Sequence, residues 1–179
     1  MRHKRLIVVT LAVAALAVAP TLADAQSVTA RPAAITATHA ASVSAVPKFV
    51  FHAGLALGAF HHFIYLPFKA GKFTSGGFLS KLKNYVEAGA AALFVYHETK
   101  LALQDAQQNK LLKVVVAPLT AVVSLFTTIV SKVKGHNLDP ATISSAQSAV
   151  TSIESQAKQS GSSVSEAIPS AKQLLTGSA

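Results

Sequence analysis

The sequence FVFHAGLALGAFHHFIYLPF, at positions 49–68, contains no lysine, arginine, aspartate or glutamate. Lys48 and Lys69 lie directly on either side of it. Its length and apolar composition predict a helix rather than a strand. Pro67 predicts the end of this helix, because proline disfavours helical backbone in the residue before it. A helical projection gathers one largely apolar face from Phe49, His52, Ala53, Ala56, Ala59, Phe60 and Phe63.

The opposite side of this segment carries Gly54 and Gly58, four residues apart. Two glycines at this spacing let another backbone approach closely, as in dimers of membrane helices. Small residues at the same spacing also occur in soluble, alanine-rich bundles. Ordinary packing between helices is therefore the favoured interpretation.

Two more helices are predicted after a turn at residues 69–77, which contain three glycines. Apolar side chains recur every three or four residues over 78–107, and this spacing predicts a second helix. A third helix is predicted over 110–134. Within it, residues 114–131 are again free of charged side chains.

The second and third predicted helices each have two different faces. On the second, a charged face is expected to contact solvent: Lys83, Glu87, Glu98 and Asp105. The other face is expected to contact the core: Val86, Ala90, Leu93 and His97. The third helix sets a stripe of hydroxyl residues opposite its apolar face: Thr120, Ser124, Thr127 and Ser131.

The serine-rich end of the chain predicts weaker helices. Asp139 followed by Pro140 is a good helix start, because aspartate caps a helix and proline suits its first position. Ser163 and Glu166 have the spacing of a capping box, which predicts the start of a last helix. Pro169 is expected to interrupt that helix.

Short connections between consecutive helices imply antiparallel neighbours. The sequence therefore predicts an all-α protein, a small up-down helical bundle built on an apolar helical hairpin. Residues 48–134 form its core, and residues 135–179 form a weaker helical tail. Residues 26–47 contain no aromatic side chain and no steady period, so they predict a flexible leader.

Residues 1–25 have the order of a secretory signal peptide. Met1–Arg5 carries three basic residues, residues 6–19 form an apolar run, and small residues stand at Ala23 and Ala25. We expect cleavage after Ala25 and a secreted protein, extracellular or in the cell envelope. Cleavage removes three basic residues and one acidic residue, so it leaves 154 residues and lowers the formal net charge from +9 to +7.

Composition and motifs argue against several classes of enzyme. The chain contains no cysteine, which excludes disulfides, thiolate metal sites and thiol nucleophiles. Residues 97–101, HETKL, begin like the helical zinc-protease motif, but leucine replaces its second histidine. No Gly-x-Ser-x-Gly motif occurs, and the acidic residues are scattered. We expect no enzymatic activity.

Two histidines, His52 and His97, are expected to face the core from neighbouring helices. In an antiparallel hairpin His52 lies level with Phe94, about one helical turn from His97. One hypothesis is that the pair binds a haem as axial ligands, or a metal ion. The alternative is two core histidines bonded to each other, to Tyr96 or to a backbone carbonyl.

The adjacent His61 and His62 are expected nearer the turn that follows the first helix. They suggest surface metal binding or a pH-sensitive patch, since histidine titrates near neutral pH. The alternative is a pair of half-exposed side chains on an otherwise apolar helix.

Six lysines are expected to gather at one end of the bundle, without an acidic residue beside them: Lys69, Lys72, Lys81, Lys83, Lys132 and Lys134. Such a cluster predicts binding of anionic lipid or of an anionic cell-wall polymer. Nucleic acid is not an expected partner, because no helix interleaves its lysines with exposed aromatic side chains.

Residues 49–68 and 114–131 approach the length that spans a membrane. Their histidines, prolines and hydroxyl residues, and the charged helix between them, fit a soluble or interfacial protein better. Both interpretations stay open. The main hypothesis is a secreted helical protein that binds anionic membrane or wall polymer, or that self-associates. The alternative is a haem- or metal-binding bundle.

Overall fold

The computed structural model describes residues 33–177, with side chains described from residue 45 onward. This part of the chain contains helices and no strand, so the predicted all-α class is confirmed. The predicted signal peptide and residues 26–32 of the predicted leader lie outside the described residues.

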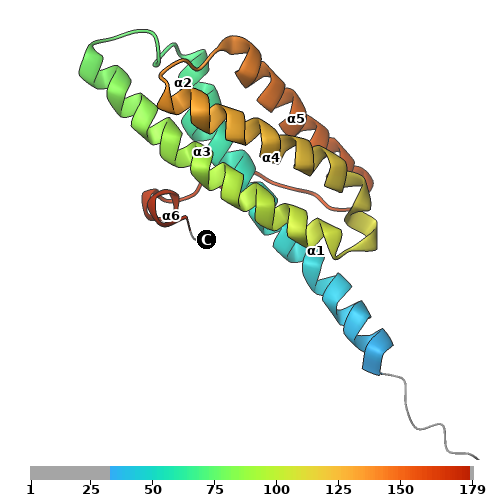
Figure 1. The fold of residues 1–179 in the computed structure, drawn as a ribbon. Coiled ribbons are helices and arrows are strands. Elements are labelled where there is room, and N and C mark those ends of the chain that lie inside the picture. The colour runs from blue at the N-terminus through green and yellow to red at the C-terminus, as the bar shows by residue number, and fades with distance from the viewer. Residues whose placement is uncertain (1–32, 178–179) are drawn as a thin grey trace, which may run out of the picture. The chain divides into compact units, whose positions relative to one another are not determined.

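Short connections join most of the helices (Figure 1). The described elements are α1 Ala33–Phe60, a π turn at His61–Tyr65, α2 Leu66–Lys69, α3 Phe78–Gln107, a 3-10 turn at Lys110–Leu112, α4 Lys113–Lys134, α5 Pro140–Gln159 and α6 Ala171–Thr176. The predicted helix over 78–107 has the bounds of α3. Asp139 caps α5 as predicted, because its carboxylate accepts a hydrogen bond from the backbone N–H of Thr142 at 2.9 Å.

Residues 33–47, predicted as part of a flexible leader, are helical and belong to α1. Pro47 lies inside this helix, although proline removes one backbone N–H. Alanine recurs through the segment and is the best helix former. The buried side chains of Ala45 and Phe49 also anchor the helix to the core. The leader prediction was wrong here because it gave weight to missing aromatic residues and none to helix propensity.

The helical path also continues past its predicted end at Pro67. The π turn at His61–Tyr65 and then α2 carry the helix to Lys69. Pro67 occupies the first turn of α2. Pro67 lies just after the π turn, where the regular hydrogen-bond pattern of the helix is already interrupted.

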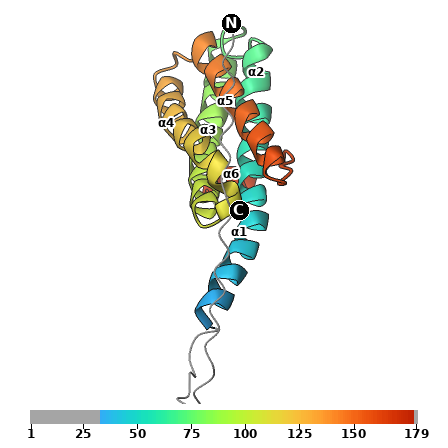
Figure 2. The ribbon, with the colours of Figure 1, turned by 90° about the vertical axis from the view of Figure 1, so that its right-hand side faces the viewer.

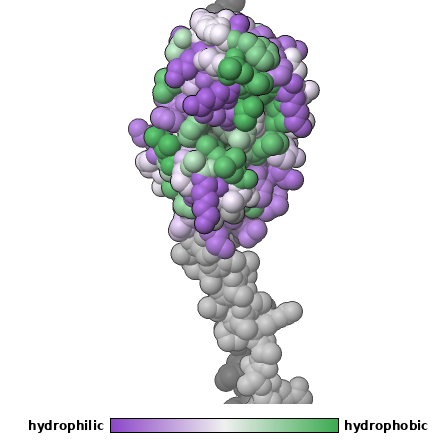
Figure 3. Space-filling model, turned by 90° about the vertical axis from the view of Figure 1, so that its left-hand side faces the viewer, coloured by the Kyte–Doolittle hydropathy of each residue, from purple (hydrophilic) through white to green (hydrophobic). Residues whose placement is uncertain are grey.

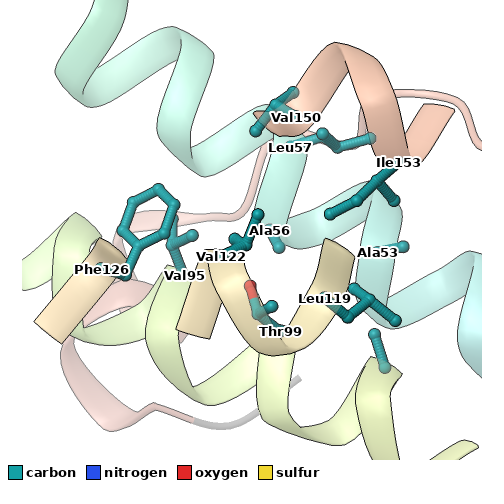
Figure 4. A pocket seen from close by; sticks show the side chains of 11 residues that line it. Ala53, Ala56, Leu57, Val95, Thr99, Leu119, Val122, Phe126, Val150 and Ile153 are labelled. Atoms are coloured by element: carbon teal, nitrogen blue, oxygen red, sulfur yellow. The ribbon is translucent and has the colours of Figure 1, made fainter. Parts of the chain in front are cut away.

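The helices pack in the order α1 on α3, α3 on α4, and α4 on α5 (Figures 1 and 2). Side chains of all four meet around a small apolar pocket of about 20 Å³ (Figure 4). The largest fully buried side chains are Phe49, Phe60, Phe94, Phe126, Ile64, Leu112, Leu119 and Ile129.

The segment 53–60 of α1 is buried at every residue. A helix that is enclosed on all sides needs an apolar surface all round, and this segment has one. The face predicted to be apolar packs inward, with Phe49, Ala53, Ala56 and Phe60 all buried. The face that carries Gly54 and Gly58 is buried as well. The α3 helix packs on the other side of α1, so another segment of the chain covers the glycines.

The cover is a stretch of non-helical chain, residues 162–170, which we call the tail strap. It joins α5 to α6 and crosses α1 (Figure 1). The backbone N–H of Ala167 donates a hydrogen bond to the carbonyl of Gly54 at 2.9 Å. A Cβ atom on Gly54 would lie 2.5 Å from the carbonyl oxygen of Ser165, and one on Gly58 would lie 2.2 Å from that of Ala167. Because Gly54 and Gly58 have no side chains, the extended backbone of the tail strap, rather than another helix, lies directly against α1 at this position.

The predicted last helix starting at Ser163 is wrong. Residues 163–169 are not helical, and the capping box belongs instead to Ser170 and Gln173 at the start of α6. Pro169 explains the difference, since a helix starting at Ser163 would contain it and lose a hydrogen bond.

We predict that Gly58→Ala lowers the free energy of unfolding by about 1–3 kcal/mol, the usual cost of overpacking. The new methyl group would collide with the backbone of Ala167. The matched control is Gly89→Ala in α3, where a Cβ makes ordinary contact with Val133 at 3.5 Å. There the substitution should stabilise by up to about 1 kcal/mol, because alanine favours the helix. Urea unfolding of both variants measures the difference, and equal stability would contradict the packing described for Gly58.

Candidate functional site

The segments that carry the six predicted lysines meet at one end of the packed helices (Figures 1 and 2). The Tyr85 hydroxyl of α3 donates to the backbone carbonyl of His136, just beyond α4, at 3.1 Å. The Asn84 side-chain amide donates to the carbonyl of Lys72, in the turn between α2 and α3, at 2.7 Å. These bonds hold the end of α4 and the turn against the first part of α3. We call this the lysine end.

Two of the six lysines have acidic partners, which corrects the expectation that none stands near. The Lys132 ammonium lies 2.7 Å from the Asp139 carboxylate. Lys83 lies 3.8 Å from Glu87, one helical turn away on the exposed surface. The hydrogen bond from Lys132, together with those from Thr142, holds the pKa of Asp139 well below its usual value. Asp139 therefore stays charged, and its stabilising contribution is lost only as the pH falls through that lowered pKa.

Lys69, Lys72, Lys81 and Lys134 have no ion pair within residues 45–177. Lys69, Lys72 and Lys134 are exposed, and Lys81 is half-buried. Four ammonium groups at one end thus lack a neutralising carboxylate in the described part of the chain. Their combined charge attracts anions to this end.

Large apolar side chains stand among these lysines. Phe78 and Leu79, the first two residues of α3, are 75% and 77% exposed. Further along the same side of α3, Leu82, Val86 and Leu93 are exposed as well. Figure 3 shows hydrophobic side chains among hydrophilic ones on the face that includes the start of α3. The sequence pattern predicted that Val86 and Leu93 contact the core, so it did not predict an exposed apolar stripe on α3.

The buried face of α3 is instead lined by small residues, including Ala88, Ala91, Ala92, Ala102 and Ala106. Alanines let α3 approach its neighbours closely. Phe94 and Val95 are buried among them, while the stripe that includes Val86 and Leu93 remains exposed. The predicted core face of α3 is thus wrong, and so is the predicted exposure of Glu98. Glu98 is completely buried.

Two hollows open on the lysine end. One of about 220 Å³ lies between α3 and α4, with Val86, Ala90 and Val133 on its wall and Lys134 beside them. The other, of about 350 Å³, lies between α2 and α5 and has Phe68 and Lys69 in its lining. Each hollow therefore places an ammonium group beside apolar side chains.

His52 pairs with Glu98 rather than with His97. The His52 Nδ1–H donates to the Glu98 Oε2 at 2.7 Å and links α1 to α3. The other carboxylate oxygen, Oε1, is buried without a hydrogen-bond partner in the described structure. Nearby Asp105 has a pKa raised by burial, which the positive charges of His52 and Lys48 partly oppose.

The predicted pairing of His52 and His97 at a haem or metal is not what the structure builds. His97 is exposed to solvent, next to the buried Glu98 in the helix. Consecutive helical residues point about 100° apart, so only one of the two can face α1. The apolar pocket in the core contains no histidine, and its 20 Å³ is far too small for a haem (Figure 4).

His61 and His62 do not share a site either. The His61 Nδ1 lies 3.0 Å from the carboxylate of Glu166 in the tail strap, whereas His62 is exposed and its ring contacts Phe63. Glu154 lies near this pair, and its pKa is raised by burial and by the negative charge of Glu166. Among residues with described side chains, no group of three or more histidines and carboxylates is arranged to hold a metal ion.

Two helices in the described residues are long and apolar enough to cross a membrane by length and composition alone. The window Ala45–Lys69 is more than half buried, as a core helix is, and Lys110–Lys134 is less than one third buried. The exposed hydroxyls of α4 donate to carbonyls one turn earlier, for example Thr120 to Val116 at 2.9 Å. Between Lys113 and Lys132, the outer face of α4 is therefore uncharged and only weakly polar.

Comparison of the chain with protein-family models, with curated proteins and with solved structures returns no match.

We predict that substitutions of His52 and of Glu98 lower the free energy of unfolding by different amounts. His52→Leu leaves a completely buried carboxylate without a partner, which costs about 3–5 kcal/mol of unfolding free energy. Glu98→Gln leaves a neutral amide, and the cost falls to about 1–3 kcal/mol. The control Glu87→Gln removes an exposed carboxylate and changes stability by less than about 0.5 kcal/mol. Chemical unfolding ranks the three variants, and a His52→Leu chain at least as stable as Glu98→Gln would contradict the pairing.

Proposed function

We propose that this protein is a secreted, non-enzymatic helical protein that binds the surface of anionic membranes through its lysine end. The observation that carries the proposal is the start of α3, where Phe78 and Leu79 are exposed near lysines that have no ion pair within residues 45–177. Apolar side chains enter the boundary between headgroups and acyl chains, and lysines around them contact anionic headgroups.

Charge complementarity selects anionic rather than neutral lipid. Each lysine held near an anionic membrane surface contributes about 1 kcal/mol of binding free energy. Lys69, Lys72, Lys81 and Lys134 are the four that supply this attraction without a competing carboxylate in the described structure. The hollows beside Lys69 and Lys134 are suited to a headgroup with part of an acyl chain.

Lipid is favoured over a wall polymer because of the apolar side chains. A soluble anionic polymer is attracted by charge alone and gives Phe78 and Leu79 nothing to bury. A membrane buries them, and full burial of such a side chain contributes about 1.5–3 kcal/mol. The predicted signal peptide supports the location, since an exported protein meets the outer surface of a membrane.

Sedimentation with phosphatidylcholine vesicles, with and without phosphatidylglycerol, tests the proposal. We expect binding to the anionic vesicles and little to the neutral ones. Lys72→Ala with Lys81→Ala should weaken binding more than tenfold, since two lysines supply about 2 kcal/mol. Phe78→Ser with Leu79→Ser should weaken it further without changing the net charge. The polyanion heparin serves as the polymer control. If the protein binds heparin as tightly as vesicles, and the serine substitutions do not weaken heparin binding, a polymer is favoured instead.

The same assay has a matched control and a variant expected to gain affinity. Lys110→Ala with Lys113→Ala removes equal charge from the opposite end of α4 and should change binding little. Asp139→Asn keeps a good N-cap for α5 but frees Lys132 from its ion pair. It should therefore bind anionic vesicles more tightly than the unsubstituted protein. If the two double lysine variants lost vesicle binding equally, or if Asp139→Asn did not bind more tightly, the result would contradict a membrane contact at the lysine end.

A further inference from the structure

The larger hollow at the lysine end has two walls of different origin. Its volume of about 350 Å³ falls in the range of about 300–1,000 Å³ that ligand pockets occupy. One wall comes from the π turn and α2, with Tyr65, Phe68 and Lys69. The other wall is one face of α5, where residues recur at helical spacing: Pro140, Ile143, Ser144, Gln147 and Ser148. Because α5 packs on α4 rather than on α2, this face stays open.

Polar side chains without partners line this hollow. The hydroxyls of Tyr65, Ser144 and Ser148 make no hydrogen bond to another described residue. The Gln147 side-chain oxygen, Oε1, is buried and also lacks a hydrogen-bond partner in the described structure. Buried polar atoms in proteins nearly always have such a partner. The last side-chain torsion of glutamine is only weakly restricted, so the amide can turn its oxygen or its NH₂ group toward the hollow.

The charge of the hollow comes from Lys69. Among the residues that line the hollow, all of them described, it is the one with a charged side chain. Lys69 is exposed and has no ion pair within residues 45–177. Asp139, the residue before Pro140, is paired instead with Lys132 at 2.7 Å. The Lys69 ammonium therefore attracts a phosphate and repels a ligand group that carries its own ammonium.

Apolar side chains complete the lining. Phe68 is half-buried and Ile143 is buried, and both pack against the core. A ligand that covers them gains from the removal of apolar surface from water. The glycerol backbone and first acyl carbons of a lipid provide such cover, whereas a small soluble phosphate does not. The lining thus combines a cation, several hydroxyl or amide groups and an apolar floor.

We propose that this hollow binds the headgroup of phosphatidylglycerol, an anionic lipid whose phosphate carries a polyol, in preference to phosphatidylserine. Lys69 binds the phosphate, while the hydroxyls of Ser144 and Ser148 and the amide of Gln147 bind the polyol. The ammonium of the serine headgroup meets repulsion from Lys69 instead. The inference rests on the proposed function for the membrane contact, and it adds which anionic lipid is selected. Both lipids have the same net charge, so the charge of the lysine end alone does not distinguish them.

Sedimentation with two kinds of vesicle tests the selection. Each contains phosphatidylcholine with the same fraction of either phosphatidylglycerol or phosphatidylserine, so the surface charge is equal. We expect about tenfold tighter binding to the phosphatidylglycerol vesicles, the effect of one or two additional hydrogen bonds. Ser144→Ala with Ser148→Ala should remove most of this preference and leave binding to phosphatidylserine vesicles unchanged. Both serines are exposed and alanine favours a helix, so this variant should fold.

The matched control is Ser145→Ala with Ser155→Ala. These serines are also exposed on α5, but they do not line the hollow. The control should keep the full preference for phosphatidylglycerol. Equal binding to the two kinds of vesicle, or a preference that survives Ser144→Ala with Ser148→Ala, would overturn the inference and leave the proposed membrane contact standing.

Calorimetry with soluble ligands tests the hollow without a membrane. Short-chain phosphatidylglycerol, kept below its micelle concentration, should bind the unsubstituted protein more tightly than it binds Ser144→Ala with Ser148→Ala. If it does so while neither anionic vesicle binds, the hollow is supported and the proposed membrane contact fails. Free glycerol phosphate should bind more weakly than the short-chain lipid, because it leaves Phe68 and Ile143 uncovered. Equal affinity for glycerol phosphate would assign the hollow to a soluble phosphate, and no binding of the short-chain lipid would overturn the inference outright.

Discussion

The close approach of backbone to backbone at Gly54 and Gly58 is the constraint on which the packing of the described residues depends. Because neither residue has a Cβ atom, the tail strap lies directly on α1 and closes the face that α3 leaves open. The segment 53–60 is then enclosed on all sides. A charge-free helix of this length needs such an enclosure to avoid exposing apolar surface to water.

This enclosure also decides what remains outside. The alanine-lined face of α3 packs inward together with Phe94 and Val95, whereas the stripe of Leu79, Leu82, Val86 and Leu93 is left on the surface. The same packing buries Glu98, which is tolerated because His52 donates a hydrogen bond to it. The exposed apolar stripe of α3 begins among lysines at Phe78. This stripe, which supports membrane binding, is exposed because α3 turns its alanine face toward α1.

Some local signals in the sequence predicted local features correctly, although the capping-box spacing of Ser163 and Glu166 did not. The bounds of α3 and the cap at Asp139 depend on residues within a few positions of each other, and both were found in the structure. The gathering of lysines followed from the order and length of the helices. The ion pair of Lys132 with Asp139 was missed although the two residues are only seven positions apart.

Features that depend on contacts between distant segments were not predictable in the same way. Hydropathy ranks leucine and valine above alanine, so it assigned the wrong face of α3 to the core. Nothing near Glu98 in sequence indicates that His52 lies opposite it. The glycine spacing indicated a close backbone approach, but the favoured interpretation, packing against another helix, was wrong. The approaching segment is the non-helical stretch 162–170, and its lack of helix depends on Pro169.

Hydrogen exchange at the Ala167 amide tests the central claim most directly. This N–H lies in a segment without regular secondary structure, and its partner is the carbonyl of Gly54 on a buried helix. We predict that it exchanges much more slowly in the folded protein than in a free peptide of residues 160–177. Exchange at the rate of the free peptide would contradict the enclosure of α1 by the tail strap.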